Sequence, residues 1–219
     1  EAQIKANLAE SKLVALKSQM NPHFVFNCIN TTQNFVLNSR KEMAYEYLAS
    51  FAKLLRLILD KSEQIFVSLE NEIEQLGLYL KLESTRFEGA FEYEITLDQE
   101  LESGVFEIPG MIVQPIVENA ILHGLVNRKD KGGMLRISFL KKGQTIVCEV
   151  EDNGIGRAEA KKIKTSKEVH YQSTAIPNIQ RRLELLQESI DVEIQYNTTD
   201  LFAEGKSSGT LVKVVLPIG

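Results

Sequence analysis

Residues 151–157 read EDNGIGR, an aspartate at the end of an apolar strand pattern followed by a Gly-x-Gly turn. Glycines let the backbone approach a bound molecule closely, and the aspartate offers a carboxylate acceptor beside them. Asp152 is therefore a candidate partner for an exocyclic amine such as that of adenine, with Gly154 and Gly156 shaping the neighbouring loop. DNGxG is also a good turn sequence, so the segment alone leaves both interpretations open.

A second polar group lies upstream, in GMIVQPIVENAILHGL, residues 110–125, which is predicted to be a helix. Asn119 and His123 are four residues apart and share a helical face, and Glu118 flanks that face. An asparagine carbonyl is a hard oxygen ligand suited to Mg²⁺, and a neighbouring carboxylate can hold the water of the ion or act as a base. The alternative is an amphipathic helix whose polar residues are simply exposed.

Two downstream segments could complete a site. The stretch from Arg157 to His170 lacks strong apolar periodicity but contains five cations: Arg157, Lys161, Lys162, Lys164 and Lys167. It is either a solvated surface loop or a mobile lid whose cations meet phosphates. SSGT, residues 207–210, enters the last strand pattern. There we expect Gly209 to leave room for a flat ring and Thr210 to hydrogen-bond to that ring.

Around these segments, strands alternate with helices from about residue 90. FEYEITLD, residues 91–98, alternates with period two, and MLRISFLKKGQTIVCEVEDNG is predicted to be a hairpin turning at Lys142–Gly143. The last two strands are centred on DVEIQYN and GTLVKVVLP. Strands and helices mixed in this way predict an α/β sandwich, with helices on one face of a mixed sheet.

The first 88 residues are predicted to be helical, which makes the chain α+β overall. An apolar stripe in the first segment comprises Ile4, Leu8, Leu13, Leu16 and Met20. After a loop at residues 38–42, a second stripe comprises Tyr47, Phe51, Leu54, Leu55, Ile58 and Leu59. Two antiparallel helices cannot cover both apolar faces alone, so we expect a homodimer through the helices of residues 1–60, forming a four-helix bundle. A connector helix, N-capped by Ser68, opens the second half, giving domains 1–66 and 67–219.

Composition narrows the classes of function. With 43% hydrophobic and 25% charged residues, the chain is of the soluble globular type, and its net charge of -5 argues against direct nucleic-acid binding. Cys28 and Cys148 have no metal-ligand spacing, which predicts reduced thiols. No apolar run approaches the roughly 20 residues of a membrane helix. The chain opens in a helical pattern without an initiator methionine, so we expect a fragment that continues an upstream sensor or membrane region.

Taken together, three segments resemble the GHKL nucleotide-binding fold of histidine kinases, type II topoisomerases and Hsp90-type chaperones: PIVENAILHG, VEDNGIG and the terminal GTLVKVVLP. The front half narrows this resemblance. LKSQMNPHFVFNCIN, residues 16–30, is similar to the phosphoacceptor box of LytS/YehU-type sensor histidine kinases, and VSLENEIEQLGLYLKLESTRF resembles their connector. The resemblance then covers nearly the whole chain.

This resemblance implies ATP and Mg²⁺ as cofactors and a response regulator receiver domain as partner. His23 would attack the γ-phosphate of ATP and later pass the phosphoryl group to an aspartate of the regulator. Asn119 would coordinate Mg²⁺, Asp152 would contact the adenine amino group directly or through water, and Thr210 would close the adenine pocket. Residues with less specific implied roles at the nucleotide are Glu118, His123, Gly154, Gly156, Lys161 and Arg182. The kinase would be the cytoplasmic domain of an inner-membrane sensor, with residues 1–66 as its dimerisation and phosphoacceptor domain and 67–219 as connector and catalytic domain.

Phe24 occupies the position after the histidine, where most histidine kinases have an acid. Asn27, four residues on, can contact the ring but cannot act as a base at pH 7, so we favour Glu118, or another carboxylate of the nucleotide-binding domain, as the group that takes the proton. Pro22 predicts a bend beside His23, because its ring opens the helical turn at the carbonyl of Ser18.

The sequence departs from the kinase pattern at residues 173–175, Ser-Thr-Ala, where a lid-hinge glycine is expected. Two further interpretations therefore stay open: a pseudokinase scaffold, and an ATP-driven conformational switch without histidine phosphorylation. A third, a helical dimerisation domain fused to an unrelated α/β domain, would leave Asn119, Asp152 and Gly156 together by chance.

Overall fold

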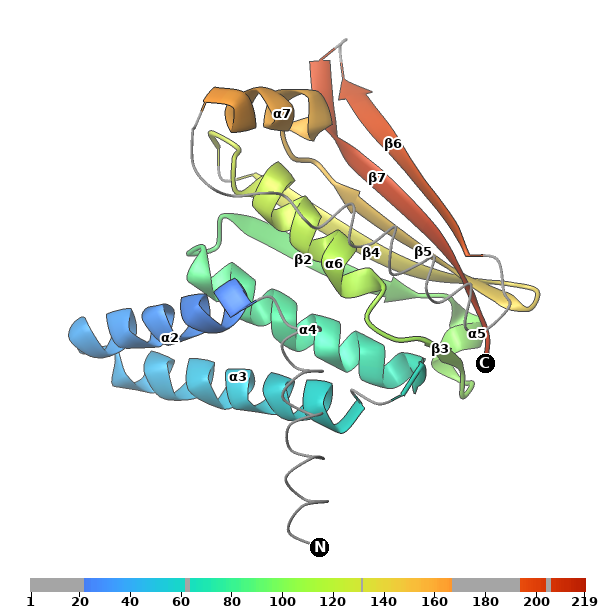
Figure 1. The fold of residues 1–219 in the computed structure, drawn as a ribbon, viewed down its shortest axis with the longest axis horizontal. Helices are drawn as coiled ribbons and strands as arrows, with labels where there is room; N and C mark the ends of the chain where they lie inside the picture. The colour runs from blue at the N-terminus through green and yellow to red at the C-terminus, as the bar shows by residue number, and fades with distance from the viewer. Residues whose placement is uncertain (1–21, 62–63, 131, 167–193, 204–205) are drawn as a thin grey trace, which may run out of the picture. The chain divides into compact units, whose positions relative to one another are not determined.

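The computed structural model describes residues 22–61, 64–130, 132–166, 194–203 and 206–219. The chain forms two compact units, residues 1–86 and residues 87–219 (Figure 1). Several expectations lie outside the described residues: the stripe from Ile4 to Met20, the backbone of Ser18 at the predicted bend, the hinge at 173–175 and the final helix with Arg182.

The first unit contains α2 (Pro22–Leu37), α3 (Lys41–Lys61), the short β1 (Phe66–Ser68) and α4 (Leu69–Arg86). The loop predicted at residues 38–42 is present as a turn between α2 and α3. The predicted cap of the connector helix is confirmed, because the Ser68 hydroxyl oxygen accepts the backbone N–H of Asn71 at 3.3 Å.

The connector helix α4 packs with the other helices of this unit. Phe24 of α2 contacts Phe51 of α3 and Tyr79 of α4, with ring centroids 6.2 and 5.0 Å apart. The sequence grouped this helix with the second half of the chain, but its packing joins it to residues 1–86.

The packing of α4 also bears on the expected homodimer, which was predicted because two helices alone could not cover their apolar faces. Most of the apolar stripe of α3 is already buried within a single chain, with Leu54 0% and Ile58 2% exposed.

The second unit is built on a five-stranded sheet in the order β2-β4-β5-β7-β6. Its strands are β2 (Phe91–Leu97), β4 (Gly133–Lys142), β5 (Thr145–Asp152), β6 (Gln195–Ala203) and β7 (Lys206–Pro217). β2 is parallel to β4 and all other pairs are antiparallel. The strand predicted at 91–98 and the Lys142–Gly143 hairpin are confirmed, with Gly143 in the left-handed region (φ 60°). β6 runs later than the predicted centre at DVEIQYN.

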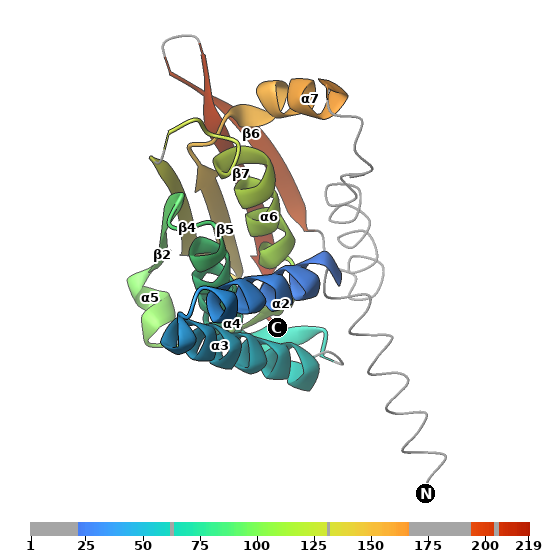
Figure 2. The same ribbon diagram turned by 90° about the vertical axis from the view of Figure 1, so that its left-hand side faces the viewer.

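The two faces of this sheet differ in chemistry. One face is apolar and buried, and it includes Leu135, Ile137, Phe139, Cys148 and Val150. The other face holds exposed ion pairs, Arg136 with Glu151 at 3.3 Å and Lys213 with Glu149 at 3.0 Å. Helices α6 and α7 lie over the apolar face (Figure 2). The predicted α/β sandwich, with helices on one face of a mixed sheet, is confirmed.

Two helices of this unit differ from the sequence expectation. The helix predicted at 110–125 starts only at Val113, because Met111 (φ 62°) still turns the chain. It consists of α6 (Val113–Asn119) and the π-helix η1 (Ala120–Leu125). The segment predicted as a loop after Gly156 is the helix α7 (Gly156–Ser166). Its Ala, Glu, Lys and Arg residues have high helix propensity, and Glu159 pairs with Lys162 at 3.0 Å.

The remaining elements are short: α5 (Gln99–Glu102) and β3 (Glu107–Pro109). Within the described residues, no helix has the length and apolarity that a membrane crossing requires.

Candidate nucleotide pocket and phosphoacceptor helix

A cavity of about 170 Å³ lies on the helix-covered face of the sheet in the second unit. One water needs roughly 10–15 Å³, so the cavity has room for a small molecule or part of a larger one. Five of the residues proposed from the sequence line it: Asn119, His123, Asp152, Gly156 and Thr210. The structure thus brings together side chains from four separate elements, α6, η1, β5 and β7, and the first residue of α7.

Asp152 is the buried acid of this cavity. Its side chain is 4% exposed, and its Oδ1 accepts the backbone N–H of Gly154 at 2.8 Å. Burial raises the pKa of Asp152 to about 6, against the lowering effect of the Gly154 and Thr210 backbone hydrogen bonds. A buried carboxylate with spare acceptor capacity suits a ligand that donates hydrogen bonds.

Asn119 is the last residue of α6, where the backbone passes into the π-helix η1. Its Oδ1 is buried and accepts no hydrogen bond from any part of the chain that the structure describes. A buried acceptor without a donor costs stability, and π-helical turns are frequent at functional sites. A cation bound at this oxygen would satisfy it, so the residues present fit Mg²⁺ at Asn119.

Glycines make the close approaches around Asp152. A Cβ added to Gly154 would lie 2.4 Å from the carbonyl carbon of Gly124 and 2.6 Å from Oδ1 of Asp152. The expectation that Gly209 leaves room for a flat ring is wrong, since its Cβ would lie 1.8 Å from the backbone oxygen of Asp152. Gly209 therefore allows β7 to pass close to the end of β5. Gly156 has φ 73°, which a residue with a side chain rarely adopts.

Replacing Gly154 with Ala should destabilise the second unit by about 1–3 kcal/mol, because the added methyl group overlaps backbone rather than a flexible side chain. Urea unfolding measures the change. Gly77→Ala is the control, since nothing lies within 4 Å of its Cβ in α4 and alanine is the better helix former. Equal stability of Gly154→Ala and the parent would contradict the assigned contact.

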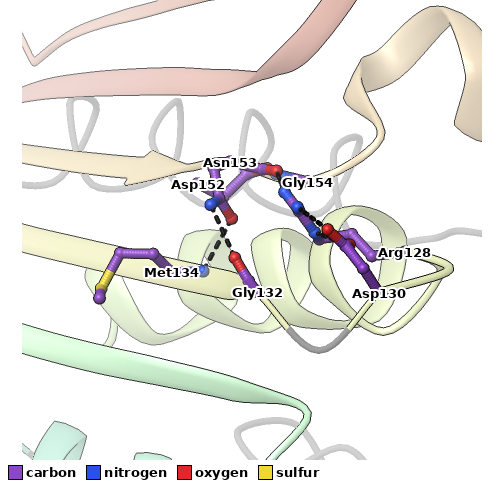
Figure 3. Close-up of polar contacts among 7 residues, drawn as sticks. All are labelled: Arg128, Asp130, Gly132, Met134, Asp152, Asn153 and Gly154. Atoms are coloured by element: carbon purple, nitrogen blue, oxygen red, sulfur yellow. Dashed lines mark hydrogen bonds and ion pairs between the residues drawn. The ribbon is translucent and has the colours of Figure 1, made fainter.

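Asn153 fixes the loop that follows Asp152, a role that the sequence did not indicate (Figure 3). Its Oδ1 accepts the backbone N–H of Met134 at 2.7 Å, and its Nδ2 donates to the carbonyl of Gly132 at 2.9 Å. Arg128 donates to the backbone oxygen of Asn153 and also forms two 2.8 Å hydrogen bonds with Asp130. Both ends of the Asn153 amide are thus used within the protein, and of these two neighbouring residues Asp152 is the one that lines the cavity.

Two other predicted residues lie elsewhere, one predicted cation does line the cavity, and two polar residues of its wall were not predicted. Lys161, on the exposed side of α7, and the half-buried Glu118 are not among the residues that line the cavity. Arg157 does line it and forms hydrogen bonds of 2.6 and 2.8 Å with Asp200 of β6. Tyr196 and Thr198 of β6 complete the wall. Their place depends on the register of β6 against β7, which no local pattern reveals.

His23 stands in the first turn of α2, exposed, with Nδ2 of Asn27 3.0 Å from its Nδ1. Partial burial of the ring lowers the pKa of His23, and the positive charge of Arg86 lowers it further. Phe24 is 6% exposed and forms part of the core of this unit. The residue after His23 therefore serves packing, and the polar group shown within hydrogen-bond distance of the imidazole comes from Asn27, one turn further along α2.

Comparison with known proteins agrees with this architecture. A family model for histidine kinases matches residues 11–91. The sensor histidine kinase BtsS of Escherichia coli K12 is 37% identical over 149 residues, which make up 68% of this chain and 26% of that protein. The sensor histidine kinase/phosphatase LytS of Staphylococcus aureus MRSA252 is 33% identical over 216 residues, 96% of this chain and 35% of that protein. This chain thus spans between a quarter and just over a third of the length of these relatives.

A solved bacterial phosphotransferase superposes with a TM-score of 0.50 at 12% identity, covering 94% of this chain and 96% of that one, which shows a shared fold. The mixed sheet with helices on one face has the fold class expected from the sequence, and its cavity is lined by an asparagine and a buried aspartate. The chain belongs to the histidine kinase family, and within it to the LytS/YehU type.

Proposed function

We propose that this chain binds Mg-ATP in the cavity of the second unit, phosphorylates itself on His23 and passes the phosphoryl group to an aspartate of a response regulator. The observation that supports the proposal most directly is that one cavity contains two buried acceptor groups able to bind a ligand. Asp152 is a buried carboxylate with acceptor capacity, and Asn119 has a buried oxygen without a donor among the described residues. The alternatives, a pseudokinase or an ATP-driven switch, share this cavity and differ only in the fate of His23.

Within the cavity, Asp152 accepts the exocyclic amine of adenine, and Thr210 closes the same edge. Oδ1 of Asn119 holds Mg²⁺, which supplies charge neutralisation for the phosphates when it is bound. The Arg157–Asp200 pair fixes one cation in the wall of the cavity. His123 lines the cavity one turn after Asn119 and orients water or phosphate there.

His23 needs one ring nitrogen with an available lone pair. An asparagine amide presents either its NH₂ group or its carbonyl to a ring nitrogen, and a half turn exchanges the two. With its carbonyl toward Nδ1, Asn27 accepts a hydrogen bond from Nδ1–H and leaves the Nε2 lone pair to attack phosphorus. The lowered pKa of His23 keeps the ring neutral at pH 7. Glu118 is the proposed acceptor of the ring proton; undiminished phosphorylation of His23 in Glu118→Gln would remove it from the mechanism.

Dimerisation through the helices of residues 1–60 is part of the proposal. Large apolar side chains remain exposed on both helices of the hairpin. They are Phe26, Ile29, Val36 and Leu37 on α2, and Met43, Tyr45 and Leu48 on α3. An exposed apolar surface of this kind fits a second copy, giving a four-helix bundle. The kinase would be the cytoplasmic part of a longer sensor protein.

The test is incubation of the purified chain with γ-phosphate-labelled ATP and Mg²⁺, beside the variant His23→Gln. We expect acid-labile, base-stable label in the parent and a loss of at least about 100-fold in the variant, because glutamine offers no nucleophilic nitrogen at pH 7. ATP binding without label in the parent would favour the pseudokinase or the switch. Transfer is tested by adding an isolated receiver domain to the labelled chain and following the label onto its aspartate.

A further inference from the structure

The peptide unit between Asn153 and Gly154 makes a hydrogen bond at each of its two ends. Its carbonyl oxygen, on Asn153, accepts a hydrogen bond from Nη1 of Arg128 (Figure 3). Its N–H, on Gly154, donates to Oδ1 of Asp152 at 2.8 Å. A trans peptide unit is planar, with its C=O and N–H pointing in opposite directions. The arginine and the aspartate therefore hold one rigid group from opposite sides.

The peptide units on either side of this one have other partners. The N–H of Asn153 donates to the carbonyl of Met134 at 3.2 Å, and the N–H of Ile155 donates to the carbonyl of Gly124 at 3.3 Å. Among the described residues, the hydrogen bonds of the 153–154 unit itself are thus the two at its ends.

The guanidinium group of Arg128 is fixed by Asp130. Its Nε and Nη2 donate to the two carboxylate oxygens of Asp130, each at 2.8 Å. Such a bidentate pair sets the plane of the guanidinium group and with it the direction of the remaining N–H groups. An ion pair whose acid is largely exposed adds little stability by itself. What this pair provides is a fixed direction for Nη1, which binds the Asn153 carbonyl.

Glycine at position 154 makes this support necessary. A peptide unit beside a glycine rotates at little steric cost, because glycine lacks the Cβ that restricts φ. Rotation of the 153–154 unit would turn its N–H away from Asp152, whose side chain is only 4% exposed. The carboxylate would then lose a hydrogen-bond donor inside the protein, where few other donors can replace it.

We propose that Arg128 is a positioning residue for Asp152. Through the 153–154 peptide unit it orients the carboxylate that receives the nucleotide base, and Asp130 holds it in the direction that this requires. The role rests on the proposed function, in which Asp152 accepts the exocyclic amine of adenine. A cation on the carbonyl oxygen also polarises the peptide unit, which strengthens the hydrogen bond from its N–H. Arg128 is not among the residues that line the cavity, so it acts through the loop and without touching the ligand.

The test follows the Gly154 amide proton by NMR between pH 4.5 and 8.5, in the full chain without nucleotide. In the parent this resonance should move as Asp152 ionises, since burial raises the pKa of that group to about 6. In Arg128→Met we expect the midpoint to rise by roughly one unit and the amplitude to fall, because the N–H no longer faces the carboxylate. Asp152→Asn identifies the part of the movement that belongs to Asp152. The other ionisable groups that line the cavity are the same in every variant: His123, Arg157 and Tyr196.

Two further variants separate positioning from the mere loss of charge. Lys129→Met removes a positive charge from the neighbouring, exposed residue of the same loop, and it should keep the midpoint and amplitude of the parent. Asp130→Ala releases Arg128 from its bidentate pair. Loss of a negative charge would by itself lower the pKa of Asp152, whereas loss of positioning should raise it, so the sign distinguishes the two. Because Asp130 is largely exposed, this variant tests the role even if Arg128→Met does not fold.

The affinity for ATP at pH 7.5, measured by calorimetry, should fall roughly tenfold in Arg128→Met and stay unchanged in Lys129→Met. A midpoint, amplitude and affinity like those of the parent, in Arg128→Met with a native circular dichroism spectrum, would overturn the role of Arg128. A fall of the Asp152 pKa in Asp130→Ala would overturn it as well.

Failure of the proposed function has a different signature. A parent that binds no ATP, but whose Gly154 resonance responds to Arg128→Met as expected, would keep Arg128 as the residue that orients Asp152 and remove adenine as the ligand. A parent that binds ATP without labelling His23, with the expected loss of affinity in Arg128→Met, would support the role of Arg128 in nucleotide binding and overturn only the kinase step.

Discussion

Asp152→Asn should lower the affinity for ATP roughly 100-fold and at the same time make the free protein more stable. The loss of affinity follows because an asparagine at this position can turn an NH₂ group toward the adenine amine, and a hydrogen bond to a charged acceptor contributes about 1.5–3 kcal/mol. The gain in stability follows because Asp152 is ionised and buried at neutral pH. The amide oxygen of asparagine can still accept the Gly154 N–H.

The sign of the stability change depends on pH. The pKa of Asp152 is raised from 3.8 to about 6, so the folded protein prefers the protonated form. Below pH 3.8 the group has no net effect on folding, and as the pH rises toward 6 it ionises in the unfolded chain first and destabilises the folded state. Above pH 6 the penalty is complete and amounts to about 3 kcal/mol, at 1.36 kcal/mol per pKa unit. Asp152→Asn should therefore differ most from the parent above pH 6 and converge with it near pH 4.

Urea unfolding at pH 4, 5, 6 and 7.5, together with calorimetric ATP binding at pH 7.5, measures both effects. Asp60→Asn makes the same chemical change at an exposed position of α3 and should alter neither quantity. A variant that loses ATP binding and also loses stability at pH 7.5 would mean that Asp152 serves the fold rather than the ligand.

Local patterns were enough to predict the parts of the fold that depend on neighbouring residues. The Ser68 cap, the Lys142–Gly143 hairpin and the strand at 91–97 each follow from a few adjacent side chains. The helix α7 was not predicted because it has few apolar residues and so no clear apolar periodicity. It is instead indicated by the high helix propensity of its residues. The parts of the cavity that depend on how several elements are arranged were harder to predict. Tyr196 and Thr198 enter the cavity only through the pairing of β6 with β7.

The glycines illustrate the same limit. The sequence indicated that the loop after Asp152 needs glycine but not what approaches it. The close neighbours of Gly154 and Gly209 are backbone atoms of Gly124 and Asp152, which come from distant or sharply turned segments. Likewise, Phe24 could be recognised as replacing an acid, but its burial against Phe51 and Tyr79 depends on how three helices pack. Contacts between residues that are far apart in the sequence do not produce a recognisable spacing in the local sequence.

Asn119→Leu should abolish the Mg²⁺-dependent part of ATP binding and reduce phosphorylation of His23 by at least about 100-fold, because each positioned oxygen on the ion contributes to phosphate neutralisation. Stability should not fall with it. Oδ1 of Asn119 is buried and accepts no hydrogen bond among the described residues, so leucine removes an acceptor that the free protein does not satisfy. Binding of a fluorescent ATP analogue, with Mg²⁺ and with EDTA, isolates the metal-dependent increment.

Asn127 offers a matched control a few residues along the same segment. Its Nδ2 donates to the carbonyl of Leu122 at 2.8 Å, so its amide is used within the protein. Asn127→Leu should therefore cost about 1 kcal/mol of stability and keep the Mg²⁺ increment, the reverse of Asn119→Leu. If Asn119→Leu instead behaved like Asn127→Leu, the buried oxygen would be a structural acceptor satisfied by water. At Asn119 and at Asp152 we expect a substitution to weaken ligand binding without lowering stability, whereas at Asn127 we expect it to lower stability without weakening binding. The reason is the same at Asn119 and Asp152: a polar group placed for a ligand destabilises the free protein until the ligand binds.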